Sequence, residues 1–148
     1  MNNFAVIELI KRLNLLYYIH YMLTIVVAAF GFFLDFQNFI SIGNANKGTI
    51  SLIYIIVAVI LLGIAITNFE IVRKKTAKES DETKKLKNYG QAATIRISLI
   101  GDVLLAGIVV FYLTKDINTL YCIAVAALAL IYSKPKESKI YNDLQIED

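Results

Sequence analysis

The sequence predicts an all-α integral membrane protein whose four transmembrane helices form an up-down-up-down antiparallel bundle. Three observations support this fold class: four long apolar stretches, a hydrophobic content of 57% with a mean hydropathy of +0.61, and basic residues that gather on one side of those stretches. A soluble domain of 148 residues could not bury so much apolar surface, because small domains cover only part of what they have. The bilayer is therefore the expected solvent, and residues 1–148 are expected to form a single transmembrane domain.

The four predicted spans differ in length, and the last is the shortest. The first has 22 residues, which at about 1.5 Å per residue is enough to cross the hydrocarbon core. It also exceeds the usual apolar region of a signal peptide, so we expect an uncleaved first helix. The fourth has only 16 residues, so it is expected to tilt little or lie shallow, and whether it crosses fully is left open. The spans are, in order, residues 13–34, 49–69, 92–114 and 117–132.

Loop charges predict the orientation of these spans. Lys47 and Lys115 are the only basic residues on one side, where a polar loop covers residues 35–47 and Lys115 and Asp116 make a tight turn. Basic loops stay in the cytoplasm. Both termini, a charged hairpin over residues 70–91 and a tail over residues 133–148 are therefore predicted to be cytoplasmic, at a bacterial inner membrane. The twelve basic residues on that side are Lys11, Arg12, Arg73, Lys74, Lys75, Lys78, Lys84, Lys85, Lys87, Lys134, Lys136 and Lys139.

Helical spacing continues beyond the predicted spans. In the hairpin, Lys75 and Glu79 stand at i,i+4 spacing, as do two further pairs of opposite charge, so the second and third helices are expected to run on into the cytoplasm. In the tail, Ile140 and Leu144 stand four residues apart. This spacing predicts a short amphipathic turn, which would lie on the membrane or on the hairpin.

Asp102 is the strongest functional candidate, because it falls at the midpoint of the third span. A charged Asp at the bilayer centre costs about 2.5–3.5 kcal/mol, and its side chain is too short to reach the headgroups. The carboxyl group is therefore expected to be protonated, paired or open to water. One reading is a proton or cation site; the other is a neutral carboxyl that hydrogen-bonds across a helix interface.

Arg96 and His20 are the two other ionisable candidates inside the spans. Arg96 is six residues from Asp102, which places the two side chains on different helix faces. Its guanidinium is expected to reach the inner headgroups, or to pair with Glu70 or Asn68 at a similar depth. His20 is a possible proton-relay partner for Asp102; the alternative is a neutral imidazole bonded to a carbonyl or a tyrosine. Tyr21, one residue on, is grouped with this candidate site.

Small residues are expected to mediate helix packing, because they let backbones approach closely in the membrane. In the fourth span Cys122, Ala126 and Ala129 follow one another at helical spacing, and Ser98 and Gly101 share a face of the third. We expect these two faces to meet across the tight turn as an antiparallel pair. The alternative is a homodimer interface.

The residue inventory excludes several kinds of chemistry. Cys122 is the only cysteine and His20 the only histidine, so we expect neither an internal disulfide nor a metal site, and no cofactor. No nucleophile and base stand at matching depths, so an enzyme is not expected, and nucleic acid is not an expected partner. Two function classes remain. The first is a non-enzymatic bundle acting through membrane protein partners or self-association in the lipid bilayer, and the second is a small transporter or ion-conducting subunit that uses Asp102.

Overall fold

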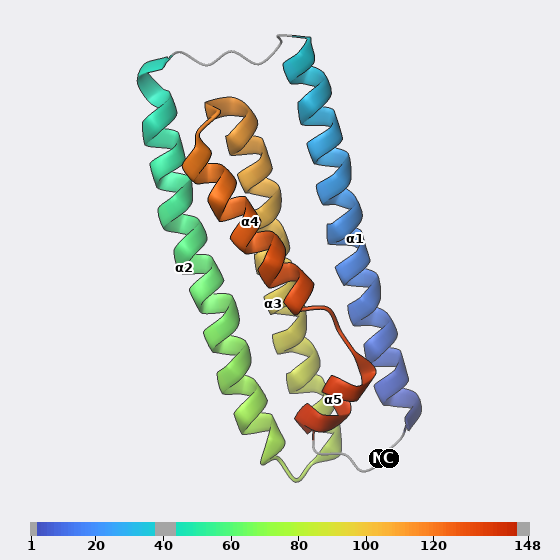
Figure 1. Cartoon of the computed structure of the whole chain (residues 1–148). Helices are drawn as coiled ribbons and strands as arrows, with labels where there is room; N and C mark the ends of the chain where they lie inside the picture. Colours follow the sequence, from blue (N-terminus) through green and yellow to red (C-terminus); the bar gives the residue numbers. More distant parts are fainter. Residues whose placement is uncertain (1–2, 38–43, 145–148) are drawn as a thin grey trace.

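The computed structural model describes residues 3–37 and 44–144, and these residues form five α-helices (Figure 1). The predicted all-α class is confirmed, since no strand occurs in the described ranges. Three helices are long and apolar enough to cross a membrane, or up to four if α4 and α5, which are bent by 74°, count as one span. These long apolar helices suggest a membrane location. The helices are α1 (Asn3–Phe36), α2 (Asn44–Ala77), α3 (Glu82–Thr114), α4 (Ile117–Tyr132) and α5 (Glu137–Leu144).

The first three helices extend well beyond the predicted spans. α1 begins ten residues earlier than predicted, because its buried side chains continue the helical spacing toward the N-terminus: Val6, Leu13, Tyr17 and His20. α2 and α3 run on as the expected hairpin, and Asp81 caps α3 by accepting from the backbone N–H groups of Thr83 and Lys84. The predicted loop 35–47 is shorter at both ends, and its residues 38–43 lie outside the described part of the chain.

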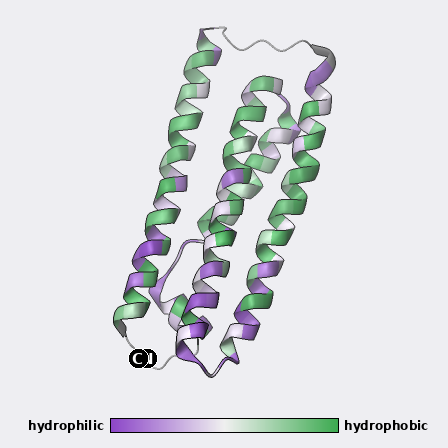
Figure 2. Ribbon diagram, turned by 180° about the vertical axis from the view of Figure 1, so that it is seen from behind, coloured by the Kyte–Doolittle hydropathy of each residue, from purple (hydrophilic) through white to green (hydrophobic). Residues whose placement is uncertain are grey.

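α3 is the central helix of the structure. It packs against α1, α2 and α4, whereas α1 and α2 have no extensive contact with one another (Figures 1 and 2). Three glycines allow this close approach. The space beside Gly90 is filled by Leu9 of α1, the space beside Gly101 by His20 of α1, and the space beside Gly107 by side chains of α2 and α4. Because these three positions have no Cβ atom, side chains of the neighbouring helices can pack directly against the α3 backbone.

The turn between α3 and α4 forms as the sequence predicts, and a polar cluster secures it. Lys115 ends α3 in the left-handed conformation at φ 56°, and its backbone N–H donates to the carbonyl oxygen of Phe111 at 2.7 Å. Asp116 then caps α4 by accepting from the N–H of Asn118 at 3.0 Å. The hydroxyl of Ser51 on α2 donates to the carboxylate of Asp116 and lies 2.8 Å from the hydroxyl of Thr119, which ties the turn to α2.

The tail folds back onto the hairpin as α5. Ile140 and Leu144 are both buried, so the expected amphipathic turn packs on α2 of the hairpin. The Asp143 carboxylate accepts from Arg73 of α2 at 2.9 Å and from the Tyr89 hydroxyl of α3 at 2.9 Å. Residues 145–148 of the predicted tail lie outside the described chain. Figure 2 shows polar residues gathered at this end of the molecule, where the α2–α3 turn and α5 lie, and apolar residues over most of the remaining length.

Candidate functional site

The structure brings Asp102 of α3 and His20 of α1 together. The Oδ1 atom of Asp102 lies 3.7 Å from Nε2 of His20, a distance that makes an ion pair when the imidazole is protonated. Gly101 makes the approach possible, because a Cβ at that position would collide with the imidazole ring. The other ring nitrogen of His20 lies 3.0 Å from the carbonyl oxygen of Leu16. Both readings of His20 from the sequence, as a partner of Asp102 and as a carbonyl-bonded ring, are therefore present in its geometry.

Asp102 faces outward from α3, not into the helix core. Its side chain is 68% exposed, whereas that of His20 is only 11% exposed. Ile95, Ala106 and Val109 are exposed on the same helix and at helical spacing from Asp102. Within the part of the chain that the structure describes, His20 is the one ion-pair partner of Asp102. Figure 2 shows α3 between α1 and α2, with no further helix in front of it in this view. The exposure of the Asp102 carboxylate places it on an open face of α3.

Arg96 points in the opposite sense, into the protein. Its side chain is buried among neighbouring helices, and the residue is only 8% exposed. Its guanidinium stacks 3.8 Å from the centroid of the Phe69 ring, and Nη2 donates to the carbonyl oxygen of Ser133 at 3.3 Å. Neither Glu70 nor Asn68 forms a hydrogen bond or an ion pair with it, and an aromatic face and a backbone carbonyl take their place.

The other predicted site residues lie apart from Asp102. Glu70 pairs with Arg73 on its own helix at 2.7 Å. Asn68 lines a groove between α2 and α3, with a volume of about 370 Å³. Tyr21 is exposed and stacks on Tyr17 with ring centroids 6.5 Å apart. The structure therefore reduces the predicted site to the pair of Asp102 and His20.

The small residues predicted to pack together also divide between two interfaces. Ala126 of α4 is fully buried, and Cys122 and Ala129 beside it are half-buried in the core that includes α3. Gly101, however, faces His20 of α1, and Ser98 is half-buried three residues before it. The predicted meeting of Gly101 with the small residues of α4 is therefore wrong. The rotation of α3 turns Gly101 toward α1 and presents Gly107 to Ile123 of α4 instead.

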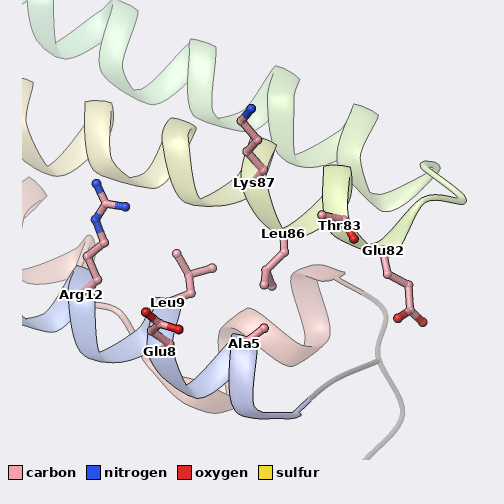
Figure 3. A pocket seen from close by; sticks show the side chains of 8 residues that line it. All are labelled: Ala5, Glu8, Leu9, Arg12, Glu82, Thr83, Leu86 and Lys87. Carbon is pink, nitrogen blue, oxygen red and sulfur yellow. The ribbon is translucent and has the colours of Figure 1, made fainter.

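Grooves run between α1 and α3 at the end of the molecule where α3 begins. One has a volume of about 380 Å³, and Figure 3 shows Leu9 and Leu86 pointing into the space between the two helices. A neighbouring groove of about 620 Å³ continues along the same pair of helices as far as Thr94 and Ile95. Both have apolar walls and charged rims, an arrangement that suits contact with lipid or with another chain more than chemistry on a small molecule.

Two polar clusters were not predicted from the sequence. The first joins Ser51, Asp116 and Thr119. The hydrogen bond that Ser51 donates to the Asp116 carboxylate is the main cause that lowers the pKa of Asp116 below its ordinary value, and the hydrogen bond from the Asn118 backbone is the second. An Asp directly before an apolar run is a helix-cap signal, so half of this cluster could have been found. The second joins Arg73, Asp143 and Tyr89 across α2, α5 and α3. No local pattern signals a cluster whose members are so far apart in the sequence.

The described residues contain no group of three or more His, Cys, Asp or Glu side chains that could hold a metal ion. Comparison of the chain with protein-family models, with curated proteins and with solved structures finds no match. Function therefore has to be inferred from the geometry around α3.

Proposed function

We propose that this chain is a four-span protein of the bacterial inner membrane with both termini on the cytoplasmic side. The support is the distribution of charge: the start of α1, the α2–α3 turn and α5 lie at one end of the molecule, and twelve basic residues precede, join or follow the apolar segments there. Lys47 and Lys115 are the basic residues of the opposite end. In this orientation the open face of α3 is a lipid-facing surface.

We further propose that the protein is not an enzyme and that it works by associating with a second membrane-spanning chain through the open face of α3. The observation that carries this proposal is the outward-facing Asp102, 68% exposed in the middle of an apolar helix. A carboxylate turned toward acyl chains costs about 2.5–3.5 kcal/mol. A helix laid over this face would remove the carboxylate from the acyl chains and satisfy it.

The first partner to consider is a second copy of this chain. Asp102 supplies an acceptor, and the adjacent His20 supplies a donor when its imidazole is protonated. A face that carries both groups side by side is complementary to itself under a two-fold rotation. Ala106, one turn from Asp102, is small and lets a second helix approach.

Cysteine crosslinking in native membranes tests this association. In a Cys122→Ala background, Ala106→Cys should form disulfide-linked dimers on mild oxidation, because it lies on the proposed interface. Val59→Cys is the matched control, since it is exposed on α2 instead of on α3. Adding Asp102→Leu should abolish the Ala106→Cys dimer. Equal crosslinking at both positions, or dimers that persist without Asp102, would contradict the proposal.

A second candidate function is a small transporter or ion-conducting subunit that uses Asp102. A polar line favours it: Gln91, Thr94, Ser98 and Asp102 follow one another at helical spacing on α3, and the first two line the 620 Å³ groove. Proton and cation flux into proteoliposomes tests this function. Flux that Asp102→Asn eliminates would support transport, and absence of flux from the unaltered protein would exclude it.

A further inference from the structure

Arg96 lines a narrow cleft where α1, α3, the end of α4 and the start of α5 meet. The free space in this cleft is about 10 Å³, which is roughly the room that one oxygen-sized group needs. The Arg96 side chain is more than nine-tenths buried, and its Nε–H has no hydrogen-bond partner among the described residues. A buried donor without an acceptor costs free energy, so the cleft favours a ligand that brings an oxygen acceptor to Nε.

The acids closest to this cleft are already engaged. Arg73 holds the Glu70 carboxylate at 2.7 Å and the Asp143 carboxylate at 2.9 Å, and Tyr89 donates to the second oxygen of Asp143. Glu70 and Asp143 act on Arg96 electrostatically but do not contact it. The charges of Arg73 and Arg96 balance those of Glu70 and Asp143. The charged residues around the mouth of the cleft therefore decide which ions enter it.

That mouth is strongly positive. Lys134, Lys136 and Lys139 all line the cleft, and the acid in the first turn of α5, Glu137, opposes them only in part. The ammonium group of Lys134 lies 5.7 Å from the ring centroid of Tyr18. Anions with several oxygen atoms, such as a phosphate group, match three lysines around one guanidinium donor.

The surroundings of the mouth favour a phosphate that arrives on a lipid. Tyr18 and Tyr132 are exposed beside Lys134 and Lys139, and amphipathic rings of this kind concentrate at the level of lipid headgroups. α1 and α4 both pack on α3 and have no extensive contact with one another, so their seam is open to acyl chains. We propose that this cleft binds the phosphate of an anionic phospholipid, with one oxygen accepting from Nε of Arg96 and the lysines holding the headgroup.

Lipid retention by the full-length protein in neutral detergent micelles tests the site, because micelles remove the general attraction of a charged membrane. The probe is short-chain phosphatidylglycerol, with phosphatidylcholine as the zwitterionic comparison, and bound lipid is counted by native mass spectrometry. The variant Lys134→Gln/Lys136→Gln/Lys139→Gln should weaken phosphatidylglycerol binding by about tenfold or more. Its matched control is Lys74→Gln/Lys75→Gln/Lys78→Gln, which makes the same charge change on exposed positions at the C-terminal end of α2 and directly after it, and should leave the affinity within about threefold.

The Nε–H resonance of Arg96 reports on the site directly. Phosphatidylglycerol should shift the resonance of one arginine Nε–H, and Arg96→Lys, which keeps the charge but lacks Nε, should remove that signal. Should this buried substitution prevent folding, the surface lysine variant still decides the question. A shift produced by inorganic phosphate alone would keep the site and overturn its assignment to a lipid. Equal losses in both lysine variants, or no shift with either phosphate, would overturn the site itself.

Discussion

The contact at Gly107 gives the sharpest stability prediction, because three helices meet there. A Cβ at this position would collide with the Tyr54 hydroxyl of α2 and lie 2.8 Å from a side-chain carbon of Ile123 on α4. Overpacking of this kind costs about 1–3 kcal/mol, against a gain of up to about 1 kcal/mol for replacing a helical glycine by alanine. Gly107→Ala should therefore lower the free energy of unfolding. Gly63→Ala is the matched control, because nothing beyond its own stretch of helix backbone lies within 4 Å of its Cβ position, and it should be neutral or stabilising.

A double-mutant cycle isolates the collision. Tyr54→Phe removes the hydroxyl that donates to the carbonyl oxygen of Val103 at 3.1 Å, and such a bond in a membrane protein is worth about 0.6–1.7 kcal/mol. In the double variant the hydroxyl is no longer in the way of the new methyl group, so the combined loss should be smaller than the sum of the single losses by about 0.5 kcal/mol or more. Unfolding is measured by titration with sodium dodecyl sulfate in mixed micelles, followed by circular dichroism. Additive losses, or equal effects of the alanines at positions 107 and 63, would refute the packing of α3 between α2 and α4.

Three further outcomes follow from the turn, the tail and the open face. The pKa of Asp116 is depressed in the folded protein, so the carboxylate stabilises the fold above its ordinary pKa, and this stabilisation is lost as pH falls through the folded value. Ser51→Ala should raise the pKa of Asp116, measured by carbon NMR titration. An unchanged pKa would contradict the cluster of Ser51, Asp116 and Thr119. Leu144→Ala removes fully buried atoms worth about 2–5 kcal/mol from an eight-residue helix, so α5 should detach and tryptic cleavage after Lys139 should accelerate. Unchanged cleavage would show that contacts other than the Leu144 side chain hold α5 in place. Asp102→Asn should change the unfolding free energy of the isolated protein by less than about 1 kcal/mol, and a larger loss in the same detergent titration would mean that the carboxylate supports the fold.

Sequence reasoning succeeded where a local rule decides the structure. The turn at Lys115 and Asp116 was predictable, because two charged residues separate two apolar stretches. The first residue, Lys115, ends α3, and the second, Asp116, caps α4. The packing of Ile140 and Leu144 followed from their spacing of four residues. The extension of α2 and α3 into the hairpin was expected from the charge spacing, but the early starts of α1 and α2 were missed. Hydropathy marks where a helix meets lipid, whereas the helical backbone continues for as long as one face finds a neighbour.

The facing of α3 could not be predicted from the sequence. Helical periodicity fixes the angle between Arg96 and Asp102 but not which of the two points inward. That choice depends on the glycine contacts, where Gly101 takes His20 from α1 and Gly107 takes side chains from α2 and α4. These contacts rotate Arg96 into the core and leave Asp102 outside.

Arg96 is buried and Asp102 is exposed because neighbouring helices cover only part of the surface of α3. α3 is flanked by α1, α2 and α4, but α1 and α2 do not close around it. On the enclosed side the positive charge of Arg96 is met by the Phe69 ring, the Ser133 carbonyl and a cleft that suits a phosphate oxygen. On the open side the Asp102 side chain is 68% exposed, and among the described residues His20 is its one ion-pair partner. The described residues form no further long helix. In the association that we propose, the covering helix comes from another molecule, and crosslinks at position 106 should reveal it.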